Sequence, residues 1–229
     1  RRQWLESVVD ALQLDRFALL AVSGGAPFAV SLAAALPGRV AALALVSPMG
    51  PVADYSASAE AALEPVSFVQ QRFFMHMPFR TWLTHPLGDL GAWMFRHGPD
   101  MLTGLLPKLA GSLDARILSK PEVARMMRDM TLEAFRQGGQ GGTADLEIFG
   151  RPWDVRYREI TAPAVIWQGT ADHIVPPQVS RWLARQLPEC RLHNLEGAGH
   201  FWVFEHVEEV VATLGTLMSQ NGIASPHVS

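Results

Sequence analysis

Apolar residues form short runs in both halves of this chain, and helical patterns separate the runs. Residues 17–22 and 40–46 are continuous apolar stretches too short for buried helices, so we interpret them as strands buried on both faces. A helix over 26–36 lies between them, and an amphipathic helix over 3–12 precedes the first strand. Strand, helix and strand in this order predict a parallel sheet that helices cover on both faces.

The same alternation returns towards the C-terminal end. The sequence predicts strands over 163–169 and 190–195, a helix over 178–187 between them and a last helix over about 205–218. These elements extend the parallel sheet, because each apolar strand is again followed by a helical segment.

The central hundred residues interrupt the alternation with helical patterns and no strand-like run. The strongest pattern spans 120–136, where Ser119 and Glu122 have the spacing of a capping box. The chain is therefore expected to have an α/β fold of mostly parallel strands with flanking helices. We divide it into a first part of the core over 1–51, an inserted helical cap over 52–150 and a second part of the core over 151–229.

Composition narrows the class of protein. Of 229 residues, 48% are hydrophobic and 18% are charged, which favours a folded domain with a substantial core. A net charge of −3 without a Lys/Arg cluster argues against nucleic-acid binding. No apolar run is long enough for a membrane span and the N-terminal residues lack a signal-peptide pattern, so we expect a cytoplasmic protein.

Neither a metal nor a cofactor is expected. The single cysteine, Cys190, excludes an internal disulfide and a cysteine-based zinc site. The glycine-rich stretch 138–142 is interpreted as a hinge or loop, because it lacks the preceding strand and the following Lys-Ser/Thr of a phosphate-binding loop.

The junction between the first strand and its helix carries the clearest chemical signal. Residues 21–25 read Ala-Val-Ser-Gly-Gly, and Pro27 follows at a position favoured in the first turn of a helix. A serine at a strand-to-helix turn, between small residues, is typical of a nucleophile elbow. Small neighbours let the two backbones approach, and the helix amino terminus offers N–H groups to a developing oxyanion. An incidental serine in an ordinary turn is the alternative.

Two further polar residues follow predicted strands. Asp172 comes after the strand over 163–169, and His200 comes after the strand over 190–195. Because the carboxyl ends of parallel strands meet at one edge, Ser23, Asp172 and His200 should converge there. A histidine can take the proton of a serine hydroxyl, and a carboxylate can hold the histidine tautomer. We interpret the remaining histidines as structural or solvated.

Three motifs in register resemble the α/β-hydrolase superfamily, in its cap-bearing serine-hydrolase branch. Residues 21–25 are similar to the elbow of that family, 169–176 to its acid turn and 197–200 to its histidine loop. A serine at the elbow argues against the related branches that use aspartate. The resemblance implies four catalytic positions: a triad of Ser23, Asp172 and His200, and an oxyanion-hole N–H at Gly24.

The sequence departs from the family pattern before the elbow. The family carries further strands there, with a His-Gly loop that supplies a second oxyanion N–H, and neither is visible ahead of residue 17. Without a neighbour, the apolar strand over 17–22 would be an unprotected edge. We therefore expect residues 1–229 alone to be poorly soluble and almost inactive, and a chain with such a segment restored to be a competent hydrolase.

The function that we expect is hydrolysis of a small or medium apolar ester through an acyl-enzyme; amide, thioester and lactone substrates stay open. The central segment is rich in Met and Phe, so Phe73, Phe74, Met126 and Met130 are expected to line the pocket for this small molecule. A purely structural helical core is the alternative for that segment. The alternatives for the whole chain are an acyltransferase with the same nucleophile, and a non-catalytic or incomplete domain that only binds a ligand or partner.

Overall fold

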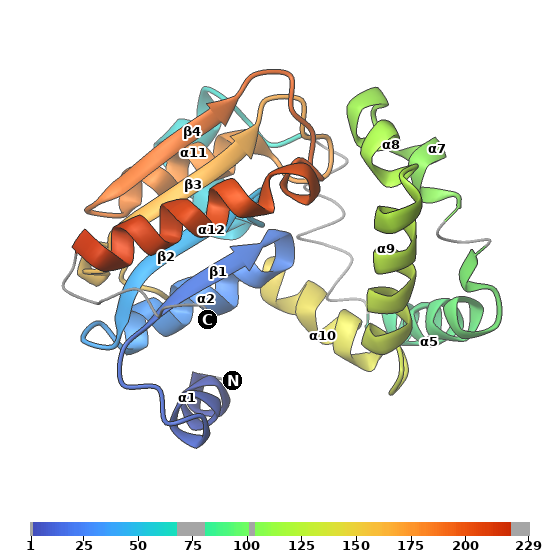
Figure 1. Ribbon diagram of the computed structural model, residues 1–229, viewed down its shortest axis with the longest axis horizontal. Coiled ribbons are helices and arrows are strands. Elements are labelled where there is room, and N and C mark those ends of the chain that lie inside the picture. The colour runs from blue at the N-terminus through green and yellow to red at the C-terminus, as the bar shows by residue number, and fades with distance from the viewer. Residues whose placement is uncertain (1, 68–80, 101–103, 221–229) are drawn as a thin grey trace.

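A parallel sheet lies at the centre of the computed structural model, which describes residues 2–67, 81–100 and 104–220 (Figure 1). Its described strands are β1 (Phe17–Val22), β2 (Val40–Val46), β3 (Ala164–Gly169) and β4 (Cys190–Leu195). They lie in this order in the sheet, and each neighbouring pair is parallel. The α/β fold predicted from the alternation of apolar runs is confirmed.

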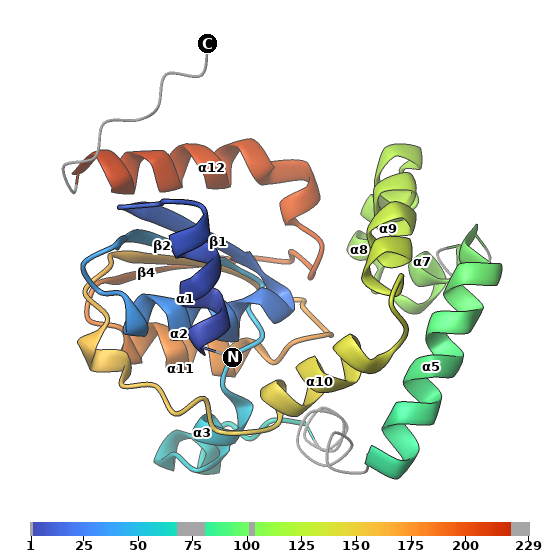
Figure 2. The ribbon, with the colours of Figure 1, turned by 90° about the horizontal axis from the view of Figure 1, so that it is seen from below.

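Helices cover the sheet on both faces (Figure 2). On one face lie α2 (Ala26–Ala35) and α11 (Pro177–Gln186), with α1 (Arg2–Ala11) packed against α2. The other face is covered by α12 (Val203–Gln220). Alternate residues of β2 and β3 enter two separate apolar cores, so these central strands are buried on both faces as predicted.

The edge strand β1 differs from that prediction. Its residues Leu20 and Val22 are 40% and 38% exposed, so the expectation of a strand buried on both faces is wrong for this element. The physical reason is its position: α12 packs mainly against β2 and leaves part of β1 uncovered.

A helical insert, residues 52–150, separates β2 from β3. Its described helices after residue 80 extend to one side of the sheet (Figure 1), whereas its first helix packs into the main core through Val52 and Tyr55. Its described residues form helices and turns without a strand, as the sequence predicted. The helices are α3 (Val52–Ser56), α5 (Thr81–His97), α7 (Leu106–Leu109), α8 (Ser112–Leu118), α9 (Pro121–Ala134) and α10 (Gln140–Phe149).

Two local expectations within the insert are wrong. Ser119 does not cap α9, because its hydroxyl donates to the carbonyl of Ala115 at 2.7 Å and Lys120 occupies the N-cap position. The glycine-rich stretch 138–142 is not a loop throughout, since α10 already begins at Gln140.

Candidate active site

Ser23 lies where β1 turns into α2. It opens a short 3₁₀ turn (Ser23–Gly25) with φ +50°, a backbone conformation that is uncommon outside glycine. The carbonyl of Ser23 accepts the Met49 backbone N–H at 2.9 Å, from the loop after β2. Pro27 lies in the first turn of α2, as predicted. The neighbouring loop and the helix start therefore hold Ser23 in a sharp, strained turn.

Three side chains from three strand ends meet at the carboxyl edge of the sheet. Ser23 Oγ lies 3.0 Å from His200 Nε2, and His200 Nδ1 lies 2.9 Å from Asp172 Oδ2. His200 and Asp172 are 5% and 4% exposed, so water has little access to the contact between them. The convergence predicted from the positions of these residues after β1, β3 and β4 is what the structure shows.

The carboxylate of Asp172 is fully hydrogen-bonded. Oδ1 accepts the backbone N–H groups of Ile174 and Val175 at 2.9 and 3.0 Å, and Oδ2 accepts the Gln168 amide at 3.2 Å. A carboxylate only accepts hydrogen bonds, so the imidazole of His200 carries its proton on Nδ1. Nε2 then presents a lone pair to the hydroxyl of Ser23, as a base would.

Sequence reasoning missed Gln168, which is fully buried in β3. Its side-chain oxygen accepts the hydroxyl of Ser180 at 2.7 Å, which orients the amide so that its N–H₂ group faces Asp172. One signal was available in the sequence: a polar residue inside an otherwise apolar, buried strand must find hydrogen-bond partners in the core.

Phe149 was missed as well. A Cβ atom on Gly24 would lie 2.7 Å from Phe149 Cζ, so the aromatic ring at the end of α10 lies directly over the residue after Ser23. Any larger residue at position 24 would therefore require the Phe149 ring to shift. The close approach also places an apolar wall from the helical insert beside the predicted oxyanion donor.

The structure places the other predicted pocket residues as follows. Met126 and Met130 lie on α9 and are 38% and 55% exposed, whereas Met127 packs into a cluster with Phe201, which follows His200 in sequence. Phe73 and Phe74 lie outside the described residues.

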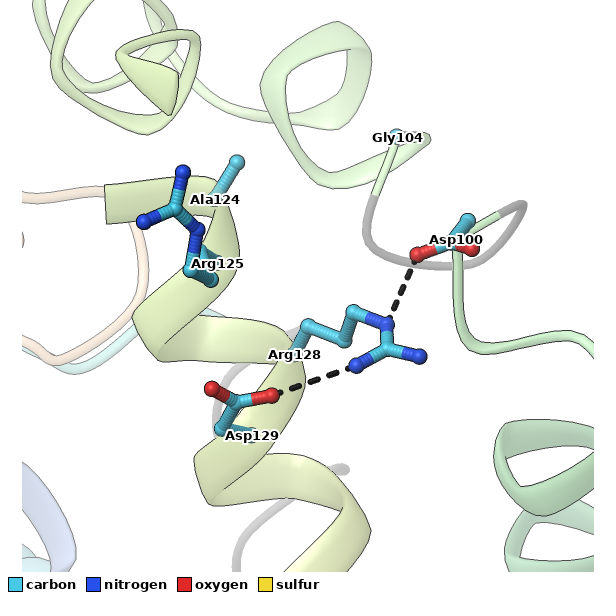
Figure 3. Close-up of a pocket in the computed structure, with 6 residues that line it drawn as sticks. All are labelled: Asp100, Gly104, Ala124, Arg125, Arg128 and Asp129. Atoms are coloured by element: carbon cyan, nitrogen blue, oxygen red, sulfur yellow. Dashed lines mark hydrogen bonds and ion pairs between the residues drawn. The ribbon is translucent and has the colours of Figure 1, made fainter. Parts of the chain in front are cut away.

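A cavity of about 270 Å³ lies between the helical insert and the loops that carry Asp172 and His200. Its lining is mostly apolar and comprises Leu106, Ala110, Gly111, Asp114, Leu118, His173, Ile174 and Phe201. A larger hollow of about 580 Å³ lies on the outside of α9 (Figure 3), and the lining of neither space includes Ser23, Asp172 or His200. Arg128 in this hollow already pairs with Asp100 and Asp129, at 2.8 and 3.2 Å.

Metal ligands, the thiol of Cys190 and membrane-spanning helices were the remaining features to compare with the described part of the chain. No group of three or more His, Cys, Asp or Glu side chains there is placed to hold a metal ion. Burial raises the pKa of the Cys190 thiol to about 12, which keeps it protonated and unreactive at neutral pH. Among the described helices, none combines the length and the apolar character that a bilayer span requires.

Comparison with known proteins defines the family. The family model described as "alpha/beta hydrolase fold" matches residues 2–207, and the chain belongs to this family. No curated protein matches the chain in sequence.

Solved structures share the fold at low sequence identity. An alpha/beta hydrolase fold protein from Nakamurella multipartita is 24% identical with a TM-score of 0.61, covering 96% of this chain and 75% of that one. A thermophilic esterase from Thermogutta terrifontis is 20% identical with a TM-score of 0.61, over 96% and 71%. The enol-lactonase from Burkholderia xenovorans LB400 is 21% identical with a TM-score of 0.57, over 95% and 71%.

Proposed function

We propose that this protein is a serine hydrolase that cleaves apolar esters through an acyl-enzyme. The observation that carries the proposal is the continuous chain of contacts from Ser23 Oγ through His200 to Asp172, at 3.0 and 2.9 Å. A nucleophile, a base and a fixed carboxylate in this order are the parts that acyl transfer needs.

The reaction follows from these positions. His200 Nε2 takes the hydroxyl proton as Ser23 Oγ attacks the acyl carbonyl, and Asp172 balances the imidazolium charge. The backbone N–H of Gly24 stabilises the oxyanion of the tetrahedral intermediate. His200 then gives its proton to the departing alcohol oxygen, and the ester bond breaks to leave an acyl-serine. Water, deprotonated by His200, attacks that acyl group, and the acid leaves as Ser23 regains its proton.

Apolar groups close to the site support the proposed substrate class. Phe149 covers Gly24, and the cavity beside the loops of Asp172 and His200 is lined mainly by carbon. We assign the helical insert the role of a cap over the site, with Phe73, Phe74, Met126 and Met130 as its substrate-selecting residues. Two similar structures are named an esterase and an enol-lactonase, which fits attack on an activated acyl–oxygen bond.

A covalent probe tests the proposal. A fluorophosphonate should label the intact protein at Ser23, and Ser23→Ala should abolish labelling and reduce p-nitrophenyl ester turnover by about 10⁶. Ser31→Ala is the matched control, because Ser31 is a half-buried serine on α2 outside the triad. Labelling that persists in Ser23→Ala, or that falls equally in Ser31→Ala, would refute Ser23 as the nucleophile.

A further inference from the structure

Asp114 connects the helical insert to the loop that carries His200. This aspartate lies on α8 and is only 4% exposed. One carboxylate oxygen accepts the backbone N–H of His200, and the other accepts the backbone N–H of Phe201, both at 2.9 Å. Hydrogen bonds from a charged acceptor to two successive amides are stronger than neutral ones, so they restrain this stretch of backbone.

Gly199 makes the contact possible. A Cβ atom at position 199 would lie 2.3 Å from Asp114 Oδ1, so any larger residue would push the carboxylate away from the two amides. The glycine immediately before His200 is thus required by a partner from a distant part of the chain, 86 residues away in the case of the His200 amide.

Additional contacts keep α8 in place against this loop. Ile117 and Leu118 are buried in an apolar cluster that includes Phe201 and Phe204. Glu205, in the first turn of α12, pairs with Lys120 at 2.6 Å and with Arg116 at 3.6 Å. The hydrogen bond from Lys120 holds the pKa of the Glu205 carboxyl below its usual range, as expected for a carboxylate that is paired with cations.

We propose that Asp114 is a positioning residue for His200, an inference that rests on His200 being the base of the proposed hydrolase. Asp172 fixes the imidazole ring from one side through Nδ1, and Asp114 fixes the backbone from which the ring projects. Together they set the 3.0 Å separation of Nε2 from Ser23 Oγ. The helical insert therefore contributes to the position of the base as well as to the walls of the site.

Three variants of the intact protein test this role. Asp114→Ala removes both acceptors, and Asp114→Asn keeps one oxygen but turns an N–H₂ group towards the second amide. Asp129→Asn, on the exposed side of α9, is the control for loss of one negative charge from the insert. Misplacing a catalytic group by 1 Å can cost about 10² in rate, so Asp114→Ala should react with a fluorophosphonate about 10²-fold more slowly. Asp114→Asn should be intermediate, and Asp129→Asn unchanged.

Two further readouts separate positioning from a general structural role. For a short p-nitrophenyl ester, kcat should fall while KM stays unchanged, because both carboxylate oxygens of Asp114 already accept backbone N–H groups, although the residue borders the cavity. Hydrogen exchange at the His200 and Phe201 amides should accelerate at least about 10-fold, while exchange in β2 and β3 stays as in the unmodified protein. If Asp114→Ala does not fold, Asp114→Asn carries both measurements.

The outcomes are distinct. A rise in KM at constant kcat would show that Asp114 contacts the substrate. A wild-type labelling rate in both Asp114→Asn and Asp114→Ala would show that Asp114 does not position His200. Either result overturns the proposal. If the unmodified protein is not labelled at Ser23, the proposed function fails instead. In that case hydrogen exchange at the His200 and Phe201 amides still tests the contact. Unchanged exchange in Asp114→Ala would refute a restraint of this loop by Asp114, and faster exchange would confirm it.

Discussion

Gln168 and Asp172 share a contact at the buried end of the site: the Gln168 amide donates to Asp172 Oδ2 at 3.2 Å, the same oxygen that faces His200 Nδ1. The hydroxyl of Ser180 fixes the orientation of that amide from the opposite side, at 2.7 Å. A neutral amide in the centre of β3 therefore limits the rotation of the carboxylate and keeps it directed at the imidazole.

Replacing Gln168 with methionine should impair both activity and stability. The change keeps the volume but removes a donor to Asp172 and the acceptor of the Ser180 hydroxyl. A hydrogen bond to a charged group contributes about 1.5–3 kcal/mol, so kcat should fall about 10-fold or more and unfolding should require less urea. Gln140→Met, at an exposed glutamine at the start of α10, should change neither quantity. Wild-type kcat in Gln168→Met would show that Asp172 is oriented without this amide.

His200 and Asp172 should differ in how much activity they control. His200→Ala removes the proposed base, which faces Ser23 Oγ, and should be nearly as damaging as Ser23→Ala, at about 10⁶ in turnover. Asp172→Asn keeps the geometry but favours the wrong tautomer, and should cost on the order of 10⁴. His193→Ala is the matched control, because it removes an exposed imidazole that lies outside the three converging residues. The ring of His193 stacks on Trp167, with 5.6 Å between ring centroids. Near-normal rates in Asp172→Asn would move the acid role to another residue.

The contact between Gly24 and Phe149 can be tested with paired variants. Gly24→Ala should lower both activity and melting temperature, because the added methyl group would lie 2.7 Å from the aromatic ring. Phe149→Ala removes the clash at a packing cost of its own, so the double variant should lose less melting temperature than the sum of the two single losses. Additive effects of the two substitutions, measured by thermal unfolding, would show that the ring does not restrict position 24.

The helical insert should set acyl-chain preference. Smaller residues at Phe73, Phe74, Met126 or Met130 should alter the preferred chain length of p-nitrophenyl esters more than the rate of fluorophosphonate labelling. The expected reason is a wider apolar pocket with an unchanged nucleophile. If all four variants keep the chain-length profile of the unmodified protein, the insert has only a structural role.

Stability should decline at high pH partly because of Cys190. Its thiol pKa is raised from 9.0 to about 12 by burial, so the folded state retains a proton that the unfolded chain releases. The contribution of the buried, protonated thiol to the free energy of unfolding is present below about pH 9 and is lost as the pH rises towards 12. Urea unfolding between pH 7 and 11 should therefore show a weaker pH dependence for Cys190→Ala. Equal slopes would mean that the thiol is as accessible in the folded state as in the unfolded chain.

The sheet and the three converging residues could be predicted because local sequence determines both. Short apolar runs specify β2 and β3, and parallel strands bring their carboxyl ends to one edge, which places Ser23, Asp172 and His200 together. The exposed side of β1 could not be predicted from its composition, because exposure depends on where α12 crosses the sheet.

The supporting contacts depend on packing between distant segments. In the sequence, Asp114 looks like an ordinary acidic residue in the first turn of a short helix, where its charge would interact favourably with the helix dipole. Its partners become visible only once α8 lies against the His200 loop. Phe149 likewise shows no motif, and its relation to Gly24 arises from the way α10 meets the start of α2.

The position of Asp114 also bears on how substrate specificity could be transplanted. A chimaera that received the insert of another hydrolase would keep Ser23, Asp172 and His200 yet lose the carboxylate that holds the amides of residues 200 and 201. If the insert selects substrate as proposed, such a graft would recognise new substrates but turn them over slowly, unless the donor segment presents an equivalent acceptor opposite Gly199. On these proposed roles, recognition and chemistry are not separable modules in this protein.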